Sequence, residues 1–540
     1  MLLLHKRLHH VISVQASVIT KPSSTPPNII FFLADDLGWA DTSFRGNPQI
    51  PTPNLDALAS SGIILNNYYV LPSCTPSRGA LMTGLYPIHT GLQHSLLLEA
   101  EPRGLSHNFT IIPEHLKDLG YTSHLVGKWN LGYYKESFTP TYRGFDSFYG
   151  YYNGGEDYYT HTFAAVYNNE TYVGLDFWNN TTPVLDQGGH YSTRLFTKRA
   201  ISLIEAHDKA KPLFLYMAHQ AAHVGDYTVG LKAPASSVAH FPYIHDLNRS
   251  IHAGAVYELD ESVRLVMESL KRKGMLENSV VAFSTDNGGL PWGDDSNSGF
   301  NWPLRGGKAT LWEGGVRGAA FVWSPLLSRV GRLSNQMMRI TDWLPTLYSA
   351  AGGDVSRLGD IDGKDMWEAL SEDLPSPRHE ILLNIDPVNN ISGLIVDNRK
   401  VVLGTYRSGL FDGRAPVPGG TRPVEGLDRM MLDSRTGAVL RDFYDVRELA
   451  VRPNWRQEVV VNCSRRNAGR NFVAASPPYY FDIQLDPCEL DNLSSTNVTE
   501  LEEMMQKLAA YAATMVPPAN LPVDPRGLPK YHHGLGAPWL

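Results

Sequence analysis

The segment NIIFFLADDLG, residues 28–38, decides the fold class of this chain. Its first seven residues form a nearly continuous apolar run, which is typical of a strand buried on both faces, as in parallel sheets. The run stops at Asp35 and Asp36. A second run, VVAFST at 280–285, stops in the same way at Asp286 and Asn287. The sequence therefore predicts two buried strands with oxygen-bearing side chains directly after their ends.

Two further apolar runs also lead into polar residues. PLFLYMA, 212–218, precedes His219 and His223, and YTSHLVG, 121–127, precedes Lys128. Between the runs, apolar residues at 256, 259, 263, 266 and 270 follow the spacing of a helix with one buried face. Alternating strands and helices predict a large, mostly parallel α/β sheet between helices, with its ligands beyond the carboxyl ends of the strands.

The pattern changes after residues 342–347, where short apolar runs at 380–384, 393–396 and 400–403 are divided by Gly, Pro and Asn. Such runs are typical of antiparallel strands. We predict three parts: an N-terminal segment 1–27, a main domain 28–365, and a smaller C-terminal α+β domain 366–540 with an antiparallel sheet and an extended tail.

Composition excludes several classes of protein. The 540 residues are 43% hydrophobic and 19% charged, which indicates a globular chain large enough for an enzyme. The net charge is −8 and no block of basic residues occurs, so we expect no nucleic-acid partner. No run of about 18 apolar residues occurs, so we expect no membrane span.

Several features favour the secretory pathway. The apolar start MLLL is followed by His5, Lys6 and Arg7, which break the apolar region of an ordinary signal peptide, so a signal peptide in residues 1–27 would be atypical. Nine Asn-x-Ser/Thr sequons indicate a glycoprotein. Their asparagines are Asn108, Asn169, Asn179, Asn180, Asn248, Asn390, Asn462, Asn492 and Asn497.

The densest chemical signal is CTPSR, residues 74–78, followed by LMTG at 81–84. Pro76 suits the first turn of a helix, which places Cys74 at the helix start and Arg78 near the same face. From these residues alone, Cys74 is either an inert thiol or a thiol nucleophile with a lowered pKa.

The motif CTPSR with its downstream Thr-Gly resembles the sulfatase family. Residues 35–38 are similar to the first metal pair of that family, GKW at 127–129 to its second signature, and TDNGG at 285–289 to its second metal pair. The order is the same over residues 28–390. GFD at 144–146, GEDYY at 155–159 and NIDP at 384–387 are most similar to metazoan arylsulfatase B-like enzymes.

The resemblance implies an alkaline-phosphatase-like core and a sulfuric ester hydrolase. It implies that a formylglycine-generating enzyme oxidises Cys74 to formylglycine in the secretory pathway, and that a calcium ion binds residue 74 with Asp35, Asp36, Asp286 and Asn287. Oxygen ligands suit calcium better than zinc. Taken alone, the Asp35-Asp36 pair would suit a turn or a helix cap more often than a metal.

The resemblance also assigns roles in catalysis. Hydrated formylglycine would attack sulfur with one hydroxyl and expel sulfate with the other. Arg78 would hold that group, Lys128 would bridge it and the sulfate, Lys308 would contact the sulfate and the leaving oxygen, and His223 would protonate the leaving group. Taken alone, Lys308 and His223 would more often be solvated or structural.

The expected substrate is a sulfated carbohydrate or a small aryl or plant sulfate ester. The loops that carry Glu156, Asp157 and His161 are expected to contact the substrate and to choose among these esters. The expected location is lysosomal or extracellular.

One residue departs from the family pattern. The family usually has G-K-W-H-L-G, whereas this chain has Asn130 where that histidine accepts the proton during sulfate release. An asparagine cannot take a proton near neutral pH, so release of sulfate is expected to be slow.

Two alternatives follow. A catalytically impaired glycoprotein of the same fold would bind sulfated ligands without turnover. A phosphatase or phosphodiesterase of the same superfamily is less favoured, because those sites usually hold two zinc ions and a Ser or Thr nucleophile. The remaining cysteines, Cys463 and Cys488, form either one disulfide or two buried free thiols.

Overall fold

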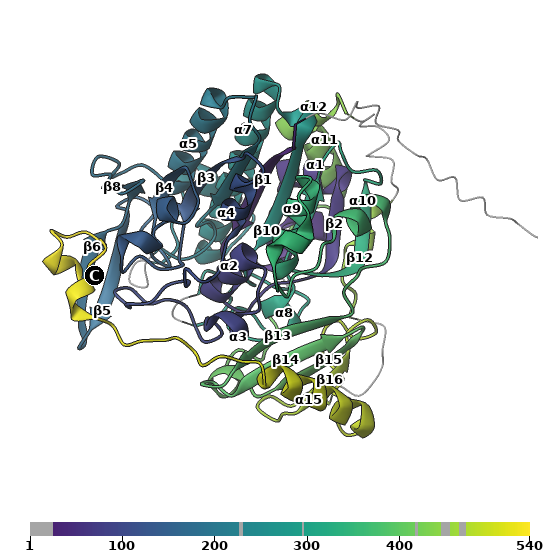
Figure 1. Cartoon of the computed structure of the whole chain (residues 1–540). Coiled ribbons are helices and arrows are strands. Elements are labelled where there is room, and N and C mark those ends of the chain that lie inside the picture. The colour runs from purple at the N-terminus through teal and green to yellow at the C-terminus, as the bar shows by residue number, and fades with distance from the viewer. Residues whose placement is uncertain (1–24, 226–229, 294–295, 416–418, 444–453, 464–470) are drawn as a thin grey trace, which may run out of the picture.

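The fold is built on a ten-stranded sheet that lies between two layers of helices (Figure 1). The computed structural model describes residues 25–225, 230–293, 296–415, 419–443, 454–463 and 471–540. The expected signal peptide therefore lies outside the described residues, apart from 25–27. In spatial order the strands are β12 (Arg332–Arg339), β2 (Ile63–Tyr69), β11 (Ala320–Trp323), β10 (Ser279–Thr285), β1 (Asn28–Ala34), β9 (Leu213–Ala218), β3 (Thr122–Lys128), β4 (Ser147–Tyr151), β7 (Trp178–Asn179) and β8 (Thr182–Pro183).

The centre of this sheet is parallel. β1 pairs with β10 on one side and β9 on the other, so that Phe31 lies between Ala282 and Tyr216. β3 and β4 continue the parallel order beyond β9. The antiparallel strands β11, β7 and β8 were not indicated by the apolar runs. The prediction of a large, mostly parallel sheet is confirmed.

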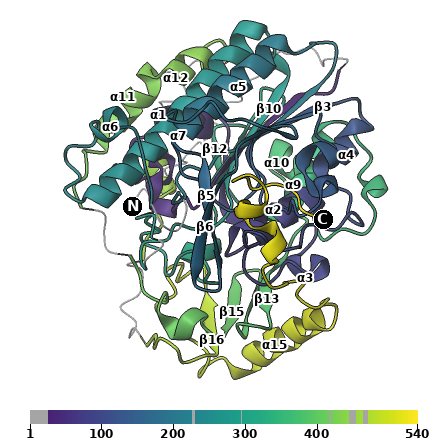
Figure 2. The same ribbon diagram turned by 90° about the vertical axis from the view of Figure 1, so that its left-hand side faces the viewer.

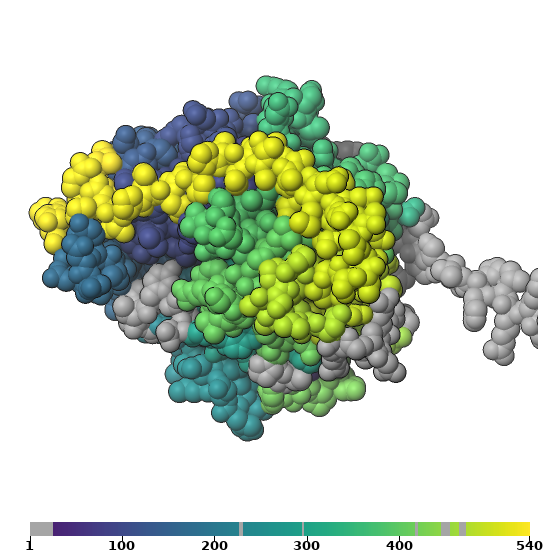
Figure 3. Space-filling model, turned by 90° about the horizontal axis from the view of Figure 1, so that it is seen from below, coloured from purple at the N-terminus to yellow at the C-terminus, as the bar shows by residue number. Residues whose placement is uncertain are grey.

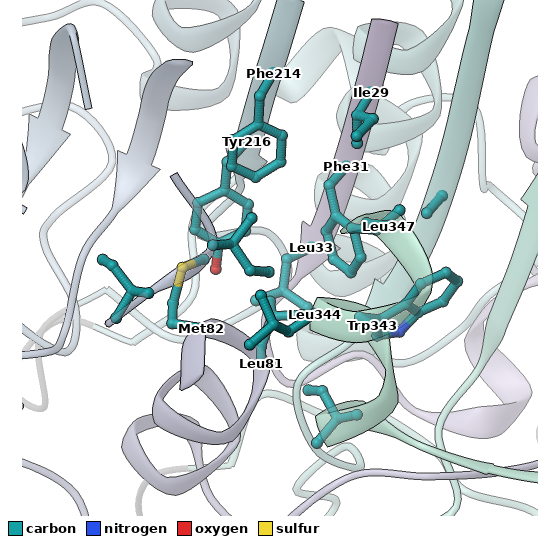
Figure 4. Packing of buried hydrophobic residues seen from close by; sticks show 14 of the residues in the cluster. Ile29, Phe31, Leu33, Leu81, Met82, Phe214, Tyr216, Trp343, Leu344 and Leu347 are labelled. Carbon is teal, nitrogen blue, oxygen red and sulfur yellow. The ribbon is translucent and has the colours of Figure 1, made fainter. Parts of the chain in front are cut away.

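Each face of β1 supplies one layer of the core. Ile29, Phe31 and Leu33 pack against three helices on one face, as Figure 4 shows for α2 and α9. These helices are α2 (Cys74–Thr83), α4 (Ile112–Lys117) and α9 (Trp343–Ala350). Burial of each large apolar side chain contributes about 1.5–3 kcal/mol, so this layer anchors α2, the helix that begins at Cys74.

The alternate residues Ile30, Phe32 and Ala34 pack against the second helix layer, whose helices Figure 2 shows. This layer contains α1 (Pro53–Ser61), α5 (Ser192–Ala206) and the long α7 (Leu247–Lys273). α7 includes the predicted apolar positions 256, 259, 263, 266 and 270, all of them buried. With no exposed face, β1 can tolerate no charge before its carboxyl end.

A smaller antiparallel sheet forms the C-terminal unit. Its order is β13 (Glu380–Asp386), β14 (Ile391–Val396), β15 (Arg399–Leu403) and β16 (Tyr479–Asp482). α15 (Val498–Ala512) packs on one face of this sheet, and Leu311, Trp312 and Val316 of the core pack on the other. The predicted smaller α+β unit is confirmed, while its boundary near residue 366 stays a prediction.

Shorter elements connect these parts. They are α3 (Pro87–Thr90), β5 (Thr162–Tyr167), β6 (Glu170–Leu175), α6 (Ala235–Val238), α8 (Glu313–Val316), α10 (Trp367–Glu372), α11 (Glu425–Asp433), α12 (Arg435–Leu440) and α14 (Trp455–Glu458). Cys463 and Cys488 are joined in a disulfide, with their Cα atoms 5.7 Å apart. In the part of the chain described above, no helix has the length and apolar character needed to cross a bilayer.

The tail after α15 returns to the main sheet domain. Val516 donates its backbone N–H to the carbonyl of Ile88, and Ala519 donates to that of Gly91, each at 2.9 Å. Near its end, Leu535 forms a bridge with Leu175 of β6. Seen from below, the tail forms a band from the C-terminal unit towards the β5–β6 ribbon (Figure 3). The C-terminal unit is therefore held to the main domain through both of its ends.

Candidate active site

The polar strand ends meet at one edge of the sheet. Asp35 and Asp36 follow β1, Asp286 follows β10, Lys128 ends β3, and His223 lies five residues beyond β9. These four strands are adjacent and parallel, so their carboxyl ends lie side by side. Asp36 adopts a left-handed backbone conformation, with φ 53°, where the strand has ended. That turn lets two consecutive carboxylates face the same space, which an extended strand would not allow.

Cys74 lies at the centre of this edge, at the first residue of α2. Its Sγ is 3.4 Å from Asp35 Oδ1 and 4.0 Å from Asp36 Oδ1. Burial and then the Asp35 carboxylate raise the pKa of the Cys74 thiol above its ordinary value. A thiolate nucleophile is therefore disfavoured here, which weighs against the lowered pKa considered from the sequence.

Three buried carboxylates are matched by three cations. Lys128 Nζ is 2.6 Å from Asp35 Oδ2, Arg78 Nη2 is 2.8 Å from Asp286 Oδ2, and Lys308 Nζ is 2.8 Å from Asp36 Oδ2. Burial alone would raise the pKa of Asp35, but Lys128, His223 and Arg78 outweigh it and hold that pKa well below its usual range. The site thus concentrates opposite charges with almost no solvent.

The same residues suit a hard cation. Asn287 donates through Nδ2 to Asp36 Oδ1 at 2.7 Å, whereas its buried Oδ1 has no hydrogen-bond partner among the described residues. Burial and then Asp35 raise the pKa of Asp286 to about 7, so a further cation beside this carboxylate would favour its ionised form. A fully buried oxygen without a partner and a carboxylate with a raised pKa both fit a bound divalent cation.

A second grouping at this edge includes His223. One ligand atom each from Asp35, Asp36, Cys74 and His223 lies within 4.8 Å of the others. His223 Nε2 is 3.6 Å from Asp36 Oδ2, and Nδ1 is 2.7 Å from the carbonyl of Val224, which leaves Nε2 as the unprotonated nitrogen. Burial and then Lys308 lower the pKa of His223 to about 4. The imidazole is therefore neutral near pH 7.

Asn130 lies directly beside α2. It has φ 54°, its backbone N–H donates to the carbonyl of Tyr152, and its side-chain Oδ1 accepts the hydroxyl proton of Thr75 at 2.8 Å. Thr75 Oγ1 in turn accepts the N–H of Leu97 at 3.0 Å. The oxygen of Asn130 is thus occupied, and its amide N–H₂ is the group that remains.

Glu156, Asp157 and His161 stay predictions as substrate contacts, and the structure places them in a buried cluster. Glu156, Asp157 and His161 are at most 2% exposed. Glu156 accepts a hydrogen bond from Ser192 at 2.7 Å and lies 3.5 Å from His161, and Asp157 pairs with Lys232. These partners come from distant segments, so the sequence pattern could not indicate them, and Glu156 Oε2 has no hydrogen-bond partner among the described residues.

Residues 156–158 are hydrogen-bonded to the segment that carries His223. Tyr158 donates its hydroxyl to the His223 carbonyl at 2.8 Å, and Gln220 donates to the Glu156 carbonyl. Residues 156, 157 and 161 are not among those that line the cavity at the opening of the site, and their contact with a substrate stays a prediction.

The opening is a cavity of about 240 Å³ with walls from both parts of the chain. His223 and Lys308 line it from the main domain. The C-terminal unit contributes Asn384, Asp386, Asn389, Ile391, Tyr406, Arg407 and Phe411. Of these, only the NIDP stretch at 384–387 was singled out in the sequence, and the loop at 406–411 carried no signal.

Comparisons with known proteins agree with this geometry. The sequence profile of the sulfatase family, described as "Sulfatase", matches residues 27–353. Arylsulfatase J of Mus musculus is 37% identical over 535 residues, covering 98% of this chain and 83% of the relative. N-acetylgalactosamine-6-sulfatase of Mus musculus is 33% identical over 358 residues, covering 64% and 66% respectively.

Solved structures show the same architecture. The crystal structure of Ps i-CgsB in complex with k-i-k-neocarrahexaose has a TM-score of 0.71 and 25% identity, covering 92% of this chain and 94% of that one. The PsFucS1 sulfatase from Pseudoalteromonas sp. has a TM-score of 0.64 and 23% identity, covering 92% of each chain. The chain belongs to the sulfatase family and is a sulfuric ester hydrolase.

Proposed function

We propose that this enzyme hydrolyses sulfate monoesters of carbohydrates, with formylglycine at position 74 and a calcium ion beside it. The observation that carries the proposal is the position of Cys74, whose Sγ lies 3.4 Å from Asp35 at the meeting point of three carboxylates and three cations. Formylglycine supplies the oxygen nucleophile when it is present, and calcium supplies the positive charge that holds it.

The ligands proposed for calcium are Asp35, Asp36, Asp286 and Asn287. Their three carboxylates are already balanced by Arg78, Lys128 and Lys308. A bound divalent cation would therefore leave about two positive charges in excess, which is the charge that a sulfate group needs to meet. Because the three carboxylates offset Arg78, Lys128 and Lys308, the net positive charge of the site stays low and product sulfate can leave.

The side chains divide into an inner and an outer set. Arg78 and Lys128 are fully buried beside Asp286 and Asp35, so we assign them to holding residue 74. Lys308 and His223 line the cavity, so we assign them to the sulfate and the leaving oxygen. An ester that enters from the cavity meets these two groups before it reaches residue 74.

His223 is proposed to protonate the leaving oxygen through Nε2. Its pKa of about 4 in the free site is too low for that task, since burial and Lys308 both disfavour the charged form. A bound sulfate ester brings a negative charge next to the ring and offsets Lys308. Substrate binding therefore raises the pKa of His223 and delivers the proton where the leaving group needs it.

Maturation is proposed to occur before folding, in the secretory pathway. Cys74 is 1% exposed, so a formylglycine-generating enzyme can reach it only before α2 packs on the sheet. The disulfide between Cys463 and Cys488 is typical of an oxidising compartment, and none of the nine sequon asparagines is buried. We propose a lysosomal or extracellular location.

The formylglycine proposal is tested by mass spectrometry of the peptide that contains residue 74, from protein made in a host with the modifying enzyme. We expect a mass that corresponds to formylglycine and release of sulfate from sulfated hexosamines. Cys74→Ala, the matched variant, should release none. Full activity from protein whose peptide has the unmodified mass would contradict the proposal.

A second candidate function is supported by Asn130. Its oxygen accepts the Thr75 hydroxyl and it has no group that can take a proton, so attack on the ester and release of sulfate become separable. In this case the protein binds sulfated ligands and turns over slowly. A rapid burst of the released alcohol followed by slow steady release of sulfate would distinguish this behaviour from full turnover.

A further inference from the structure

The cavity above Cys74 holds a second cation that the reaction does not require. Among the residues that line it, two carry a permanent positive charge: Lys308 at the reacting end and Arg407 on the loop Tyr406–Gly409 of the C-terminal unit. Lys308 is engaged by Asp36 at 2.8 Å. Arg407 contacts the ring of Tyr406, with Cζ 5.5 Å from the centroid, and forms no ion pair with a carboxylate of the described residues.

The backbone at Arg407 adopts an energetically unfavourable conformation. Arg407 has φ 45° and ψ 51°, and Ser408 follows with φ 53° and ψ 35°, so two successive residues with side chains occupy the left-handed region. Each such residue costs on the order of 1 kcal/mol, and strain of this kind is concentrated at ligand sites. Glycine would remove the strain, yet both positions carry side chains.

The carboxylate that lines the same cavity cannot neutralise Arg407. Asp386 accepts from His94 Nδ1 at 2.9 Å, from the N–H groups of Val388 and Asn389, and from Asn389 Nδ2 at 2.8 Å. These four donors saturate its two oxygens. A guanidinium at the mouth of a cavity with no available carboxylate is suited to bind an anion with two parallel hydrogen bonds.

Other residues that line the cavity are suited to a sugar. Asn384 and Gln93 line the cavity, and each leaves its buried side-chain oxygen without a hydrogen-bond partner in the described part of the chain. Hydroxyl groups are the donors that such oxygens need. Leu96, Ile391 and Phe411 add apolar surface for a ring face. A small aryl sulfate offers few hydroxyl donors and no second charge.

We propose that the substrate is a sulfated saccharide with a second anionic group, a carboxylate or another sulfate, and that Arg407 binds this group. The inference rests on the proposed function, because it takes the scissile sulfate to lie at Lys308 and His223. It goes further by naming the class of saccharide: one with at least two negative charges, separated by the span of the cavity.

The experiment measures binding in the full chain with Cys74→Ala, which separates recognition from turnover. Three probes are compared: a hexosamine monosulfate, the same sugar with two sulfates, and the monosulfated sugar linked to a uronic acid. We expect a second anion to tighten Kd by about tenfold, as charge-assisted hydrogen bonds do. Arg407→Asn should abolish this gain, and asparagine tolerates the left-handed backbone at this position.

The matched control is Arg429→Asn, which removes one positive charge from an arginine side chain that is 87% exposed in α11. It should keep the tenfold gain. A gain for the disulfated probe alone assigns the second anion as sulfate, and a gain for the uronate probe alone assigns it as carboxylate; both support the inference.

Equal affinity for all three probes, or a gain that survives Arg407→Asn, would overturn the inference. Failure of the proposed function has a different signature. In that case the protein with intact Cys74 releases no sulfate from any probe, while the gain from a second anion and its loss in Arg407→Asn persist.

Discussion

The hydroxyl of Thr75 donates to the side-chain oxygen of Asn130 across 2.8 Å, one residue beyond Cys74. Through this bond α2 orients the amide of Asn130, so that the N–H₂ group is the part left for a ligand. A donor therefore stands where members of this family usually have a group that can accept a proton. Under the second candidate function, an amide at this position slows the release of sulfate.

Asn130→His is expected to raise steady-state turnover of a chromogenic aryl sulfate by about 100-fold, the usual contribution of a positioned general base. Histidine tolerates the φ of 54° at this position, so the backbone should not change. Asn130→Gln keeps the amide and is the control that should remain slow. Equal rates for the parent and Asn130→His, with no covalently sulfated protein detected by its added mass, would contradict this prediction.

Removal of calcium is expected to abolish activity and lower the melting temperature. With a cation present at 100 times its Kd, the folded state gains about 2.7 kcal/mol, which is lost after treatment with a chelator. Asn287→Leu removes a proposed ligand oxygen that has no partner among the described residues, so it should raise the calcium concentration needed for recovery. Differential scanning calorimetry with and without added calcium checks both. An unchanged melting temperature after chelation would contradict the proposed site.

Gly127→Ala is expected to destabilise the protein by more than about 3 kcal/mol and to displace Lys128. A Cβ at Gly127 would lie 2.0 Å from the Ala218 carbonyl oxygen, and the residue has φ 111°. Relief of that overlap requires β3 and β9 to separate next to the site. Gly120→Ala is the control, because it also has a positive φ of 82° but meets nothing within 4 Å, so it should cost about 1 kcal/mol. Urea unfolding of both variants measures the difference.

Lys400→Met is expected to cost about 3–5 kcal/mol. Lys400 is fully buried, with Nζ 2.9 Å from Glu313 and 2.7 Å from Glu489, so its removal takes the ion-pair partner from Glu489 and leaves Glu313 with Arg317, 3.5 Å away. Lys507→Met breaks the more exposed pair with Glu380 and should cost less than about 1 kcal/mol. If both variants unfold at the same urea concentration, the buried cluster contributes less than this reasoning requires.

Acid is expected to destabilise the protein partly through His219. Burial lowers the pKa of His219 to about 3, whereas an unfolded histidine titrates near 6.5. Between these values the unfolded state binds more protons, so stability falls as the pH drops below 6.5, by up to about 1.4 kcal/mol per pH unit.

His219→Phe, which keeps a ring beside Phe32, should flatten the dependence of stability on pH by this amount. The exposed His245, changed to Phe, serves as the control and should leave the slope unchanged. Identical slopes for His219→Phe and the parent between pH 4.5 and 6.5 would contradict the assignment.

The apolar runs predicted the central strands closely. Residues 28–34 form β1 as expected, and the run at 280–285 lies within β10. A strand buried on both faces must be apolar throughout, so its position is visible in a single sequence. The same reasoning placed Asp35, Asp36 and Asp286 at strand ends, and the structure brings them together.

Positions that depend on long-range contacts were not predictable. The sequence shows the charge of Glu156 but not that Ser192, 36 residues away, supplies its hydrogen bond. Arg407 was not predicted, because its loop has no periodic pattern; the loop follows β15, whose Val402 packs against Leu311 and Trp312 of the main domain. The type of a charged residue does not show whether its side chain is buried, and the position of a loop next to a cavity depends on the tertiary structure.

The tail after α15 contacts the main domain at two places, Val516 with Ile88 and Leu535 with Leu175. If only one end of the C-terminal unit were attached, this unit could move relative to the catalytic residues of the main domain. Attachment at both ends restrains such movement and so keeps the width of the cavity constant. Substitutions in the C-terminal unit can therefore change which esters enter the cavity without changing the catalytic residues of the main domain. Trimming the last twenty-odd residues should therefore loosen selectivity before it harms the chemistry.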